Sequence, residues 1–205
     1  MTNQELLCYQ MNPQEIEKWQ QLCRVIRQKF ATLQLPEVAY EELEKQLQPG
    51  TPYTYVKGYT ESDGYFHVEA GDRGSSYLIF KTTNRQEAEE QIIKSLAHDV
   101  SYRYVVNQME QIELQNRGHW RFYKVVDGRE PDRIISHEEE NKTWKYDAKY
   151  DYRKYWFELA LYILKYTVSQ QTLVEEVQRY EDLLNRRLEA SPWKYDLEKE
   201  EFIMR

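Results

Sequence analysis

The sequence predicts an α+β protein in which a small antiparallel sheet of three to four strands packs against long helices, with further helices at its N- and C-terminal sides. Two observations predict this class. Apolar residues recur every three or four positions in the N-terminal segment and again in the second half, as in amphipathic helices. Between these regions, short alternating runs are separated by turn residues, which is typical of hairpin strands. The length of 205 residues suits a single domain.

The N-terminal segment, residues 1–50, is predicted to be helical. Asn12 can cap a helix whose first position is Pro13. One apolar stripe follows, formed by Ile16, Trp19, Leu22, Cys23, Ile26 and Phe30. Pro36 ends this helix, and a short second helix is expected over Tyr40–Leu47.

A three-stranded meander is predicted after residue 51. Its expected strands are Tyr53–Tyr59, Tyr65–Ala70 and Tyr77–Phe80. An Asp63-Gly64 turn joins the first two strands, and a turn at Gly71–Ser75 joins the last two. A sheet this small needs a helix on its apolar face, and the helical pattern from Glu87 to about Leu114 supplies one.

The region after residue 116 carries weaker signals. The aromatic run His119–Val126 could extend the preceding helix or form a strand, and His137–Lys142 reads as a charged loop. Asp151–Leu164 is apolar around much of its circumference, which predicts the most buried helix. A last helix is expected to open with a Thr172-x-x-Glu175 capping box and to end near Ser191.

Composition restricts the classes of partner. A net charge of −7 argues against nucleic acid as the main partner, because phosphate backbones are bound by clustered Lys and Arg. The same charge would attract a basic protein, although it also suits ordinary solubility. The chain shows neither a membrane-spanning run nor a signal peptide, so we expect a cytoplasmic protein.

The sequence shows no strong enzyme motif, and we expect neither catalysis nor a cofactor. Cys8 and Cys23 form no close pair with each other or with a histidine, so no metal site or disulfide is expected. The alternation of His67 with Glu69 on one strand could start an acid–base pair. A solvated strand face is the commoner reason for such a pair.

Three motifs in order resemble the Immunity protein 63 family of bacterial polymorphic-toxin systems. The first is the tyrosine-rich hairpin that ends in Tyr65–Gly74 with its acid-Arg-Gly turn. The second is the Thr82-Thr83-Asn84 cap with its helix, and the third is the helix start Tyr150–Phe157. The resemblance covers residues 51–192, with an insertion around 118–149, and the chain differs by having Asp72 and Lys154 at motif positions.

The resemblance implies a cytoplasmic α+β protein that binds and neutralises a cognate toxin domain. A basic, nuclease-type toxin would suit the acidic chain. Alternatives are a regulatory adaptor that binds a partner other than a toxin, and a small hydrolase that uses His67 and Glu69. The sequence leaves the oligomeric state open.

Candidate site residues fall into two groups. The expected partner-binding residues lie on the outward side of the hairpin and in the charged loop: Tyr53, Tyr55, Tyr65, His67, Asp72, Glu138, Glu139 and Glu140. The resemblance also marks Glu69, Arg73, Asp151 and Arg153, which we interpret as structural. Arg153 stands beside much apolar surface and should find an acidic partner, such as Glu69 or Asp72.

Overall fold

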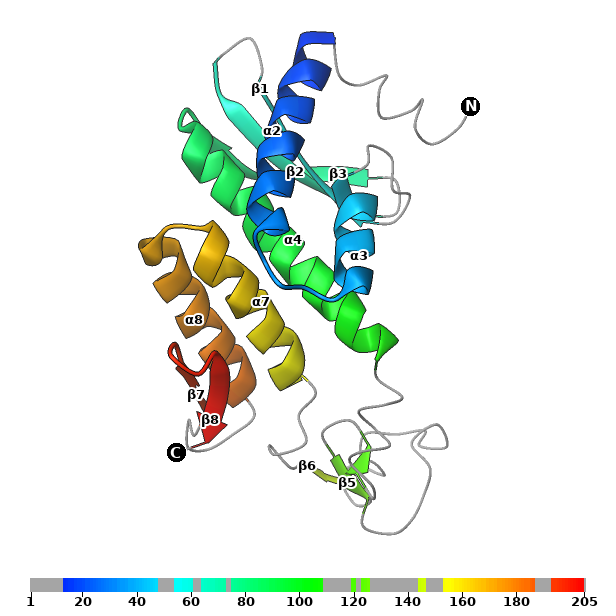
Figure 1. Ribbon diagram of the computed structural model, residues 1–205, viewed down its shortest axis with the longest axis vertical. Coiled ribbons are helices and arrows are strands. Elements are labelled where there is room, and N and C mark those ends of the chain that lie inside the picture. Colours follow the sequence, from blue (N-terminus) through cyan, green and yellow to red (C-terminus); the bar gives the residue numbers. More distant parts are fainter. Residues whose placement is uncertain are drawn as a thin grey trace.

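The structure is a computed structural model that describes residues 13–47, 54–60, 64–72, 75–108, 119–120, 123–125, 144–146, 153–186 and 193–204. Helices predominate among these residues, and the strands pair antiparallel (Figure 1). The described helices are α2 (Pro13–Ala31), α3 (Glu37–Leu47), α4 (Arg85–Asn107), α7 (Arg153–Thr167) and α8 (Gln170–Asn185). The predicted α+β class is therefore confirmed.

The N-terminal helices follow the apolar pattern of the sequence. Helix α2 begins at Pro13, and five members of its predicted stripe are buried: Trp19, Leu22, Cys23, Ile26 and Phe30. Helix α3 begins at Glu37, earlier than predicted, because the carbonyl of Pro36 already accepts a hydrogen bond from the N–H of Ala39 at 2.9 Å. Pro36 therefore separates the two helices and also starts the second one.

The first sheet is built from β1 (Thr54–Thr60), β2 (Phe66–Asp72) and β3 (Ser75–Thr82) in the order β1-β2-β3. Before β2, Gly64 has a φ of +81°, a left-handed conformation that glycine adopts without strain. Helix α4 contacts all three strands, while α2 and α3 contact β1. Val68 is completely buried, and Phe66 packs against the same core. One face of the sheet is thus covered by helices.

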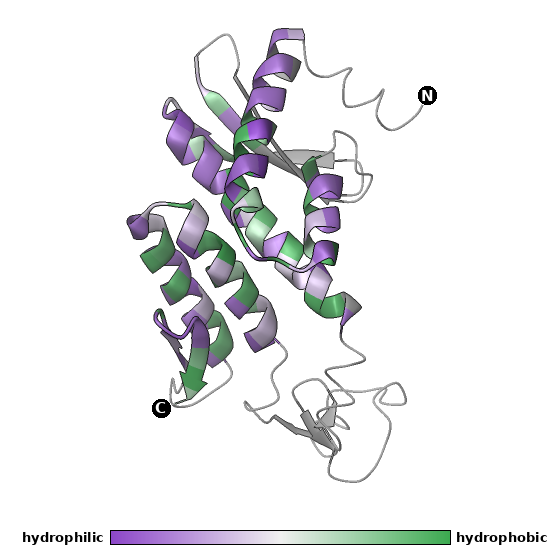
Figure 2. Ribbon diagram, viewed as in Figure 1, coloured by the Kyte–Doolittle hydropathy of each residue, from purple (hydrophilic) through white to green (hydrophobic). Residues whose placement is uncertain are grey.

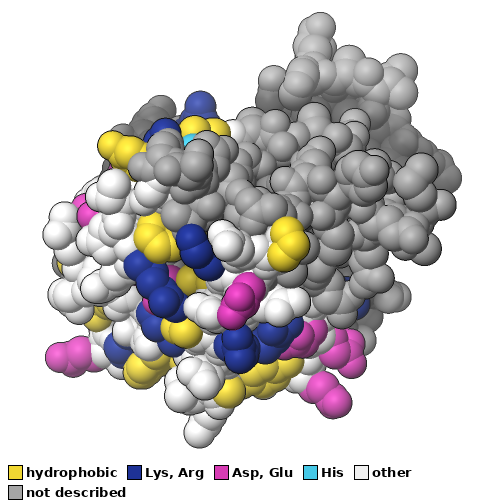
Figure 3. Space-filling model, turned by 90° about the horizontal axis from the view of Figure 1, so that it is seen from above, with side chains coloured by type: hydrophobic (Ala, Val, Ile, Leu, Met, Phe, Trp, Pro, Cys, Tyr) yellow, Lys and Arg dark blue, Asp and Glu magenta, His cyan; other side chains and the backbone are white. Residues whose placement is uncertain are grey.

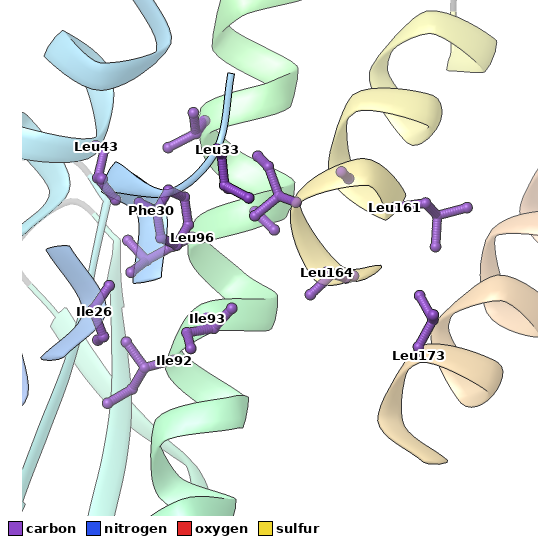
Figure 4. Close-up of a cluster of buried hydrophobic side chains, with 14 of the residues drawn as sticks. Ile26, Phe30, Leu33, Leu43, Ile92, Ile93, Leu96, Leu161, Leu164 and Leu173 are labelled. Carbon is purple, nitrogen blue, oxygen red and sulfur yellow. The ribbon is translucent and has the colours of Figure 1, made fainter. Parts of the chain in front are cut away.

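Helix α4 joins the two halves of the hydrophobic core. Figure 4 shows Ile92 and Leu96 of α4 beside Ile26 and Phe30 of α2. On the other side of α4, Leu161 of α7 lies toward Leu173 of α8. In Figure 2 the visible sides of α2 and α3 are mainly hydrophilic, while hydrophobic residues recur along α7 and α8. Most of the inward side chains of α7 are fully buried, as the sequence predicted: Ala160, Leu161, Ile163 and Leu164.

The C-terminal part differs from the prediction. The cap of α8 is Ser169, whose Oγ accepts a hydrogen bond from the N–H of Thr172, so Thr172 lies inside the helix rather than before it. Helix α8 ends at Asn185, and the described chain closes with a hairpin of β7 (Trp193–Asp196) and β8 (Glu201–Met204). The expected C-terminal helix is therefore followed by strands that the sequence did not indicate.

Three short strands lie in the region of the predicted insertion. They are β4 (His119–Trp120), β5 (Tyr123–Val125) and β6 (Trp144–Tyr146), which pair in the order β4-β5-β6. Two structures were considered for the aromatic run His119–Val126, and its described residues, 119–120 and 123–125, form strands. None of the described helices combines the length and apolar character needed to cross a membrane.

Candidate functional site

The face of the first sheet that points away from the helices is the candidate site. Side chains alternate between the two faces of a strand, so His67 lies opposite in direction to the helix-facing Phe66 and Val68. Lys81 pairs with His67 in the register of β2 and β3. We call the following described residues the outer sheet face: Tyr65, His67, Leu78, Ile79 and Lys81.

A β-bulge in β3 gives this face its apolar character. Val68 pairs with Phe80, whereas the next residue of β2, Glu69, pairs with Leu78. Ile79 is therefore an extra residue, and the alternation of β3 is interrupted there. Leu78 is 51% exposed and Ile79 is 40% exposed. In a regular strand, one of two adjacent side chains would turn toward the helices, so the bulge explains why both are exposed.

An aromatic ring and a cation border the two aliphatic side chains. Tyr65 is 39% exposed, and Nζ of Lys81 lies 4.4 Å from the centroid of its ring. This cation–π geometry holds the ring and the ammonium together in water. Among the described strands, β3 lies at the edge of the first sheet. Its bulge and its lysine both discourage pairing with another strand. The outer sheet face therefore offers side chains rather than backbone groups.

His67 differs from the expectation that it would be exposed. Its side chain is only 7% exposed, so it can contribute little contact area to a partner. Tyr65 remains the partner-binding candidate whose exposure the structure establishes. The sequence pattern correctly placed both residues on the hairpin, but alternation reports the direction of a side chain and not what covers it.

The remaining predicted residues divide into three groups. Tyr55, Glu69 and Asp72 are placed by their backbone in β1 and β2, where Tyr55 lies opposite Gly71 and Asp72 opposite Thr54. Several predicted residues lie outside the described residues: Tyr53, Arg73, Glu138, Glu139, Glu140 and Asp151. Arg153 donates from Nη1 to the carbonyl of Leu183 at 2.9 Å. That carbonyl belongs to the last turn of α8, so this contact ties the start of α7 to the end of α8.

A second cluster of polar side chains lies between α4 and α8, and the sequence analysis missed it. Three residues of α4 at spacings of four meet three residues of α8 at the same spacing: Glu90, Lys94 and His98 meet Thr172, Glu176 and Tyr180. Nζ of Lys94 lies 2.9 Å from Glu176, and Nδ1 of His98 lies 3.1 Å from the hydroxyl of Tyr180. We call these pairs the α4–α8 ladder. The pairs follow one another in the same order along both helices, so the two helices run parallel.

Burial sets the protonation of the pair His98 and Tyr180 in the ladder. It lowers the pKa of His98 to about 4, an effect to which Arg179 adds and which Glu176 opposes. It also raises the pKa of Tyr180 well above its ordinary value. At neutral pH the tyrosine hydroxyl is therefore protonated and can donate to the unprotonated Nδ1 of His98. Each of the two side chains thus provides the hydrogen-bond partner of the other, which indicates a structural contact between α4 and α8.

Charge is unevenly distributed over the described part of one face of the molecule. Figure 3 shows that, on the described surface seen from above, Lys and Arg gather near the middle among hydrophobic side chains, while Asp and Glu lie mainly toward the edge. The net charge of −7 therefore does not describe every surface. Within the described part of the chain, no group of three or more His, Cys, Asp or Glu residues is arranged to hold a metal ion.

Comparisons with known proteins identified no protein that is similar to this chain. No family model matches the chain, and no curated protein or solved structure matches it either.

Proposed function

We propose that this chain is a cytoplasmic immunity protein that binds a toxin domain with its outer sheet face and neutralises the toxin by covering it. The observation that carries the proposal is the exposure of Leu78 and Ile79 beside Tyr65. The order of motifs that resembles an immunity-protein family supports the toxin as the kind of partner.

The geometry of this face suits a protein partner. Aromatic and large aliphatic side chains form the centre of many protein interfaces, with polar residues around them. Here the apolar residues stand on a sheet that α4 supports from behind, so little ordering would be needed on binding. A standard interface buries roughly 800 Å² per partner. The outer sheet face would form its centre, and neighbouring residues would complete it.

Two other functions were considered from the sequence. A regulatory adaptor would use the same surface for a different partner, and the identity of the bound protein separates it from an immunity protein. A hydrolase would need His67 and Glu69 to reach a substrate. The burial of His67 favours the binding protein over the hydrolase.

Co-expression tests the proposal. The probe is a candidate toxin domain taken from a gene adjacent to that of this chain, produced in bacteria with or without this chain. We expect the wild-type chain to restore growth and to form a complex that survives size-exclusion chromatography. The double variant Leu78→Asp/Ile79→Asp should lose both effects, because it places two carboxylates in the apolar centre of the interface.

Val174→Asp is the matched control. Val174 is 54% exposed on α8, so it also replaces an exposed apolar side chain with a carboxylate, but away from the sheet. This variant should protect as well as the wild type. Protection by the double variant would contradict the use of the outer sheet face, and failure of the wild type to protect would contradict the immunity function.

A further inference from the structure

One face of the β7–β8 hairpin encloses two polar atoms. Trp193 is 4% exposed and Tyr195 is 9% exposed, and both belong to the hydrophobic core. Within the part of the chain that the structure describes, neither Nε1 of Trp193 nor the hydroxyl of Tyr195 has a hydrogen-bond partner. The two residues are two positions apart in β7, so their side chains point to the same side of the strand. We call this side the inner hairpin face.

Buried polar atoms of this kind are uncommon. Most buried polar side-chain atoms form at least one hydrogen bond, either with the protein or with ordered water. A buried donor without a partner is unfavourable, because it has lost its contact with water and gained nothing in return. Two such donors on one side of a four-residue strand therefore indicate that each has an acceptor outside the protein.

The chemistry of the two groups restricts the kind of acceptor. The indole N–H of Trp193 can only donate a hydrogen bond. Burial, reinforced by the charges of Glu200 and Glu158, raises the pKa of Tyr195 well above its ordinary value. The hydroxyl of Tyr195 is therefore protonated at neutral pH and can donate as well. Both groups need an acceptor, which a metal cation does not supply.

The surroundings disfavour an anion as that acceptor. The carboxylate of Glu158 accepts from the N–H of Phe202, which pairs with Tyr195 across the hairpin. Lys154 lies nearby, but its ammonium is 3.6 Å from Glu158 and is thus already opposed by that charge. A water molecule meets both conditions. It has no charge, it accepts from buried donors, and it can donate its own hydrogens to an acceptor such as Glu158.

We propose that internal water molecules bind at the inner hairpin face and accept hydrogen bonds from Trp193 and Tyr195. Such waters would add to the side-chain contacts that attach the hairpin to the helices, among them the contact of Glu158 with Phe202. The inference concerns the chain alone, so it is independent of the proposed function and of any partner protein.

Magnetisation transfer from water tests the inference directly. In the ¹⁵N-labelled full chain, the indole N–H of Trp193 should show a cross-peak to water whose sign in the rotating frame identifies bound water rather than proton exchange. The indole N–H of Trp156 is the matched control, because it donates to the carbonyl of His98 at 3.0 Å and should show no such cross-peak. The absence of the cross-peak at Trp193 would overturn the inference.

Tyr195→Phe gives a second test, because it removes the hydroxyl and little else. If water accepts a hydrogen bond from this hydroxyl, the urea midpoint of unfolding should fall, by about 0.5 M. If the hydroxyl has no acceptor, its removal should raise the midpoint, since an unsatisfied group is lost. Tyr155→Phe, which alters an exposed ring on α7, should leave the midpoint unchanged. A raised or unchanged midpoint for Tyr195→Phe would contradict the inference.

Discussion

Two adjacent residues of α4 show that burial can move pKa values in opposite senses. It lowers the pKa of His98 to about 4 and raises the pKa of Asp99 to about 6. For Asp99, Glu42 adds to the rise and Arg103 opposes it. In both residues the charged form is the one that burial disfavours. Their contributions to the pH dependence of stability therefore have opposite signs.

For His98, we expect the free energy of unfolding to fall as the pH drops from about 6.5 to 4. The unfolded chain binds the proton in this window and the folded chain does not, so acid favours unfolding. In His98→Gln this part of the pH dependence should disappear, as measured by urea denaturation at several pH values. A variant that loses stability in acid as steeply as the wild type would contradict the assignment.

For Asp99, the change of the free energy of unfolding with pH has the opposite sign. Its raised pKa means that the folded chain binds the proton more readily, so this residue destabilises the fold as the pH rises through 6. Asp99→Asn should raise the free energy of unfolding at pH 7 by about 1–2 kcal/mol. The gain should fade as the pH falls below the ordinary aspartate value of 3.8, where both states of the wild type become protonated. A loss of stability at pH 7 would show that the charged carboxylate is needed.

At the scale of elements, α8 is held at its start by a carboxylate from another helix. Glu90 of α4 accepts hydrogen bonds from the N–H of Ser169 at 3.1 Å, from its hydroxyl at 2.9 Å and from the hydroxyl of Thr172. In an ordinary capping box, a residue of the same helix supplies this acceptor. Burial alone would raise the pKa of Glu90, but hydrogen bonds from Thr172, Gln86 and Ser169 outweigh it and lower the pKa.

Removing this carboxylate should weaken the contact between α4 and α8. We expect Glu90→Ala to reduce the free energy of unfolding by about 2–3 kcal/mol, because hydrogen bonds to a charged group are lost and their donors stay buried. Glu175→Ala, which removes an exposed carboxylate from α8, should change it by less than about 0.5 kcal/mol. Both values come from urea denaturation. Equal effects of the two substitutions would contradict the role of Glu90.

The C-terminal hairpin is fixed by side chains that bind its backbone. Asn185 accepts from the N–H of Trp193 and donates to the carbonyl of the same residue, both at 3.0 Å. Glu181 accepts from the N–H of Tyr195 at 2.9 Å, and Glu158 from that of Phe202 at 2.6 Å. The amide of Asn185 thus takes the place of a neighbouring strand at the edge of β7.

We expect Asn185→Leu to loosen this hairpin selectively. The substitution leaves a buried donor and a buried acceptor of Trp193 without their partner, which costs about 1–3 kcal/mol per group. Hydrogen exchange should accelerate at Trp193 and Tyr195 and remain unchanged in α4. Gln178→Ala, an exposed substitution in the same helix, serves as the control. Unchanged exchange at Trp193 would contradict this account.

Across the whole molecule, the elements that could be predicted are those whose residues carry a long periodic pattern. The stripe of α2 and the apolar circumference of α7 are examples. The β7–β8 hairpin could not be predicted, because four-residue strands carry almost no pattern. Its backbone contacts come from residues far away in sequence, such as Glu158. The cap at Ser169 was missed for a similar reason, since part of its support comes from Glu90.

The candidate site was predictable in position but not in composition. Tyrosine content and alternation led to the hairpin and to Tyr65. Leu78 and Ile79 were missed, because adjacent apolar residues in a strand are normally divided between two faces and nothing in the local sequence announces a bulge. The α4–α8 ladder requires two helices to be aligned, which a single helical pattern cannot reveal.

The most direct test of the outer sheet face as a binding surface is the dissociation constant of the candidate toxin domain for Leu78→Asp, compared with that for Val174→Asp. The account predicts that Leu78→Asp weakens binding by about tenfold or more, equivalent to about 1.4 kcal/mol, and that Val174→Asp stays within about twofold of the wild type. Equal affinities for the two variants would contradict the account.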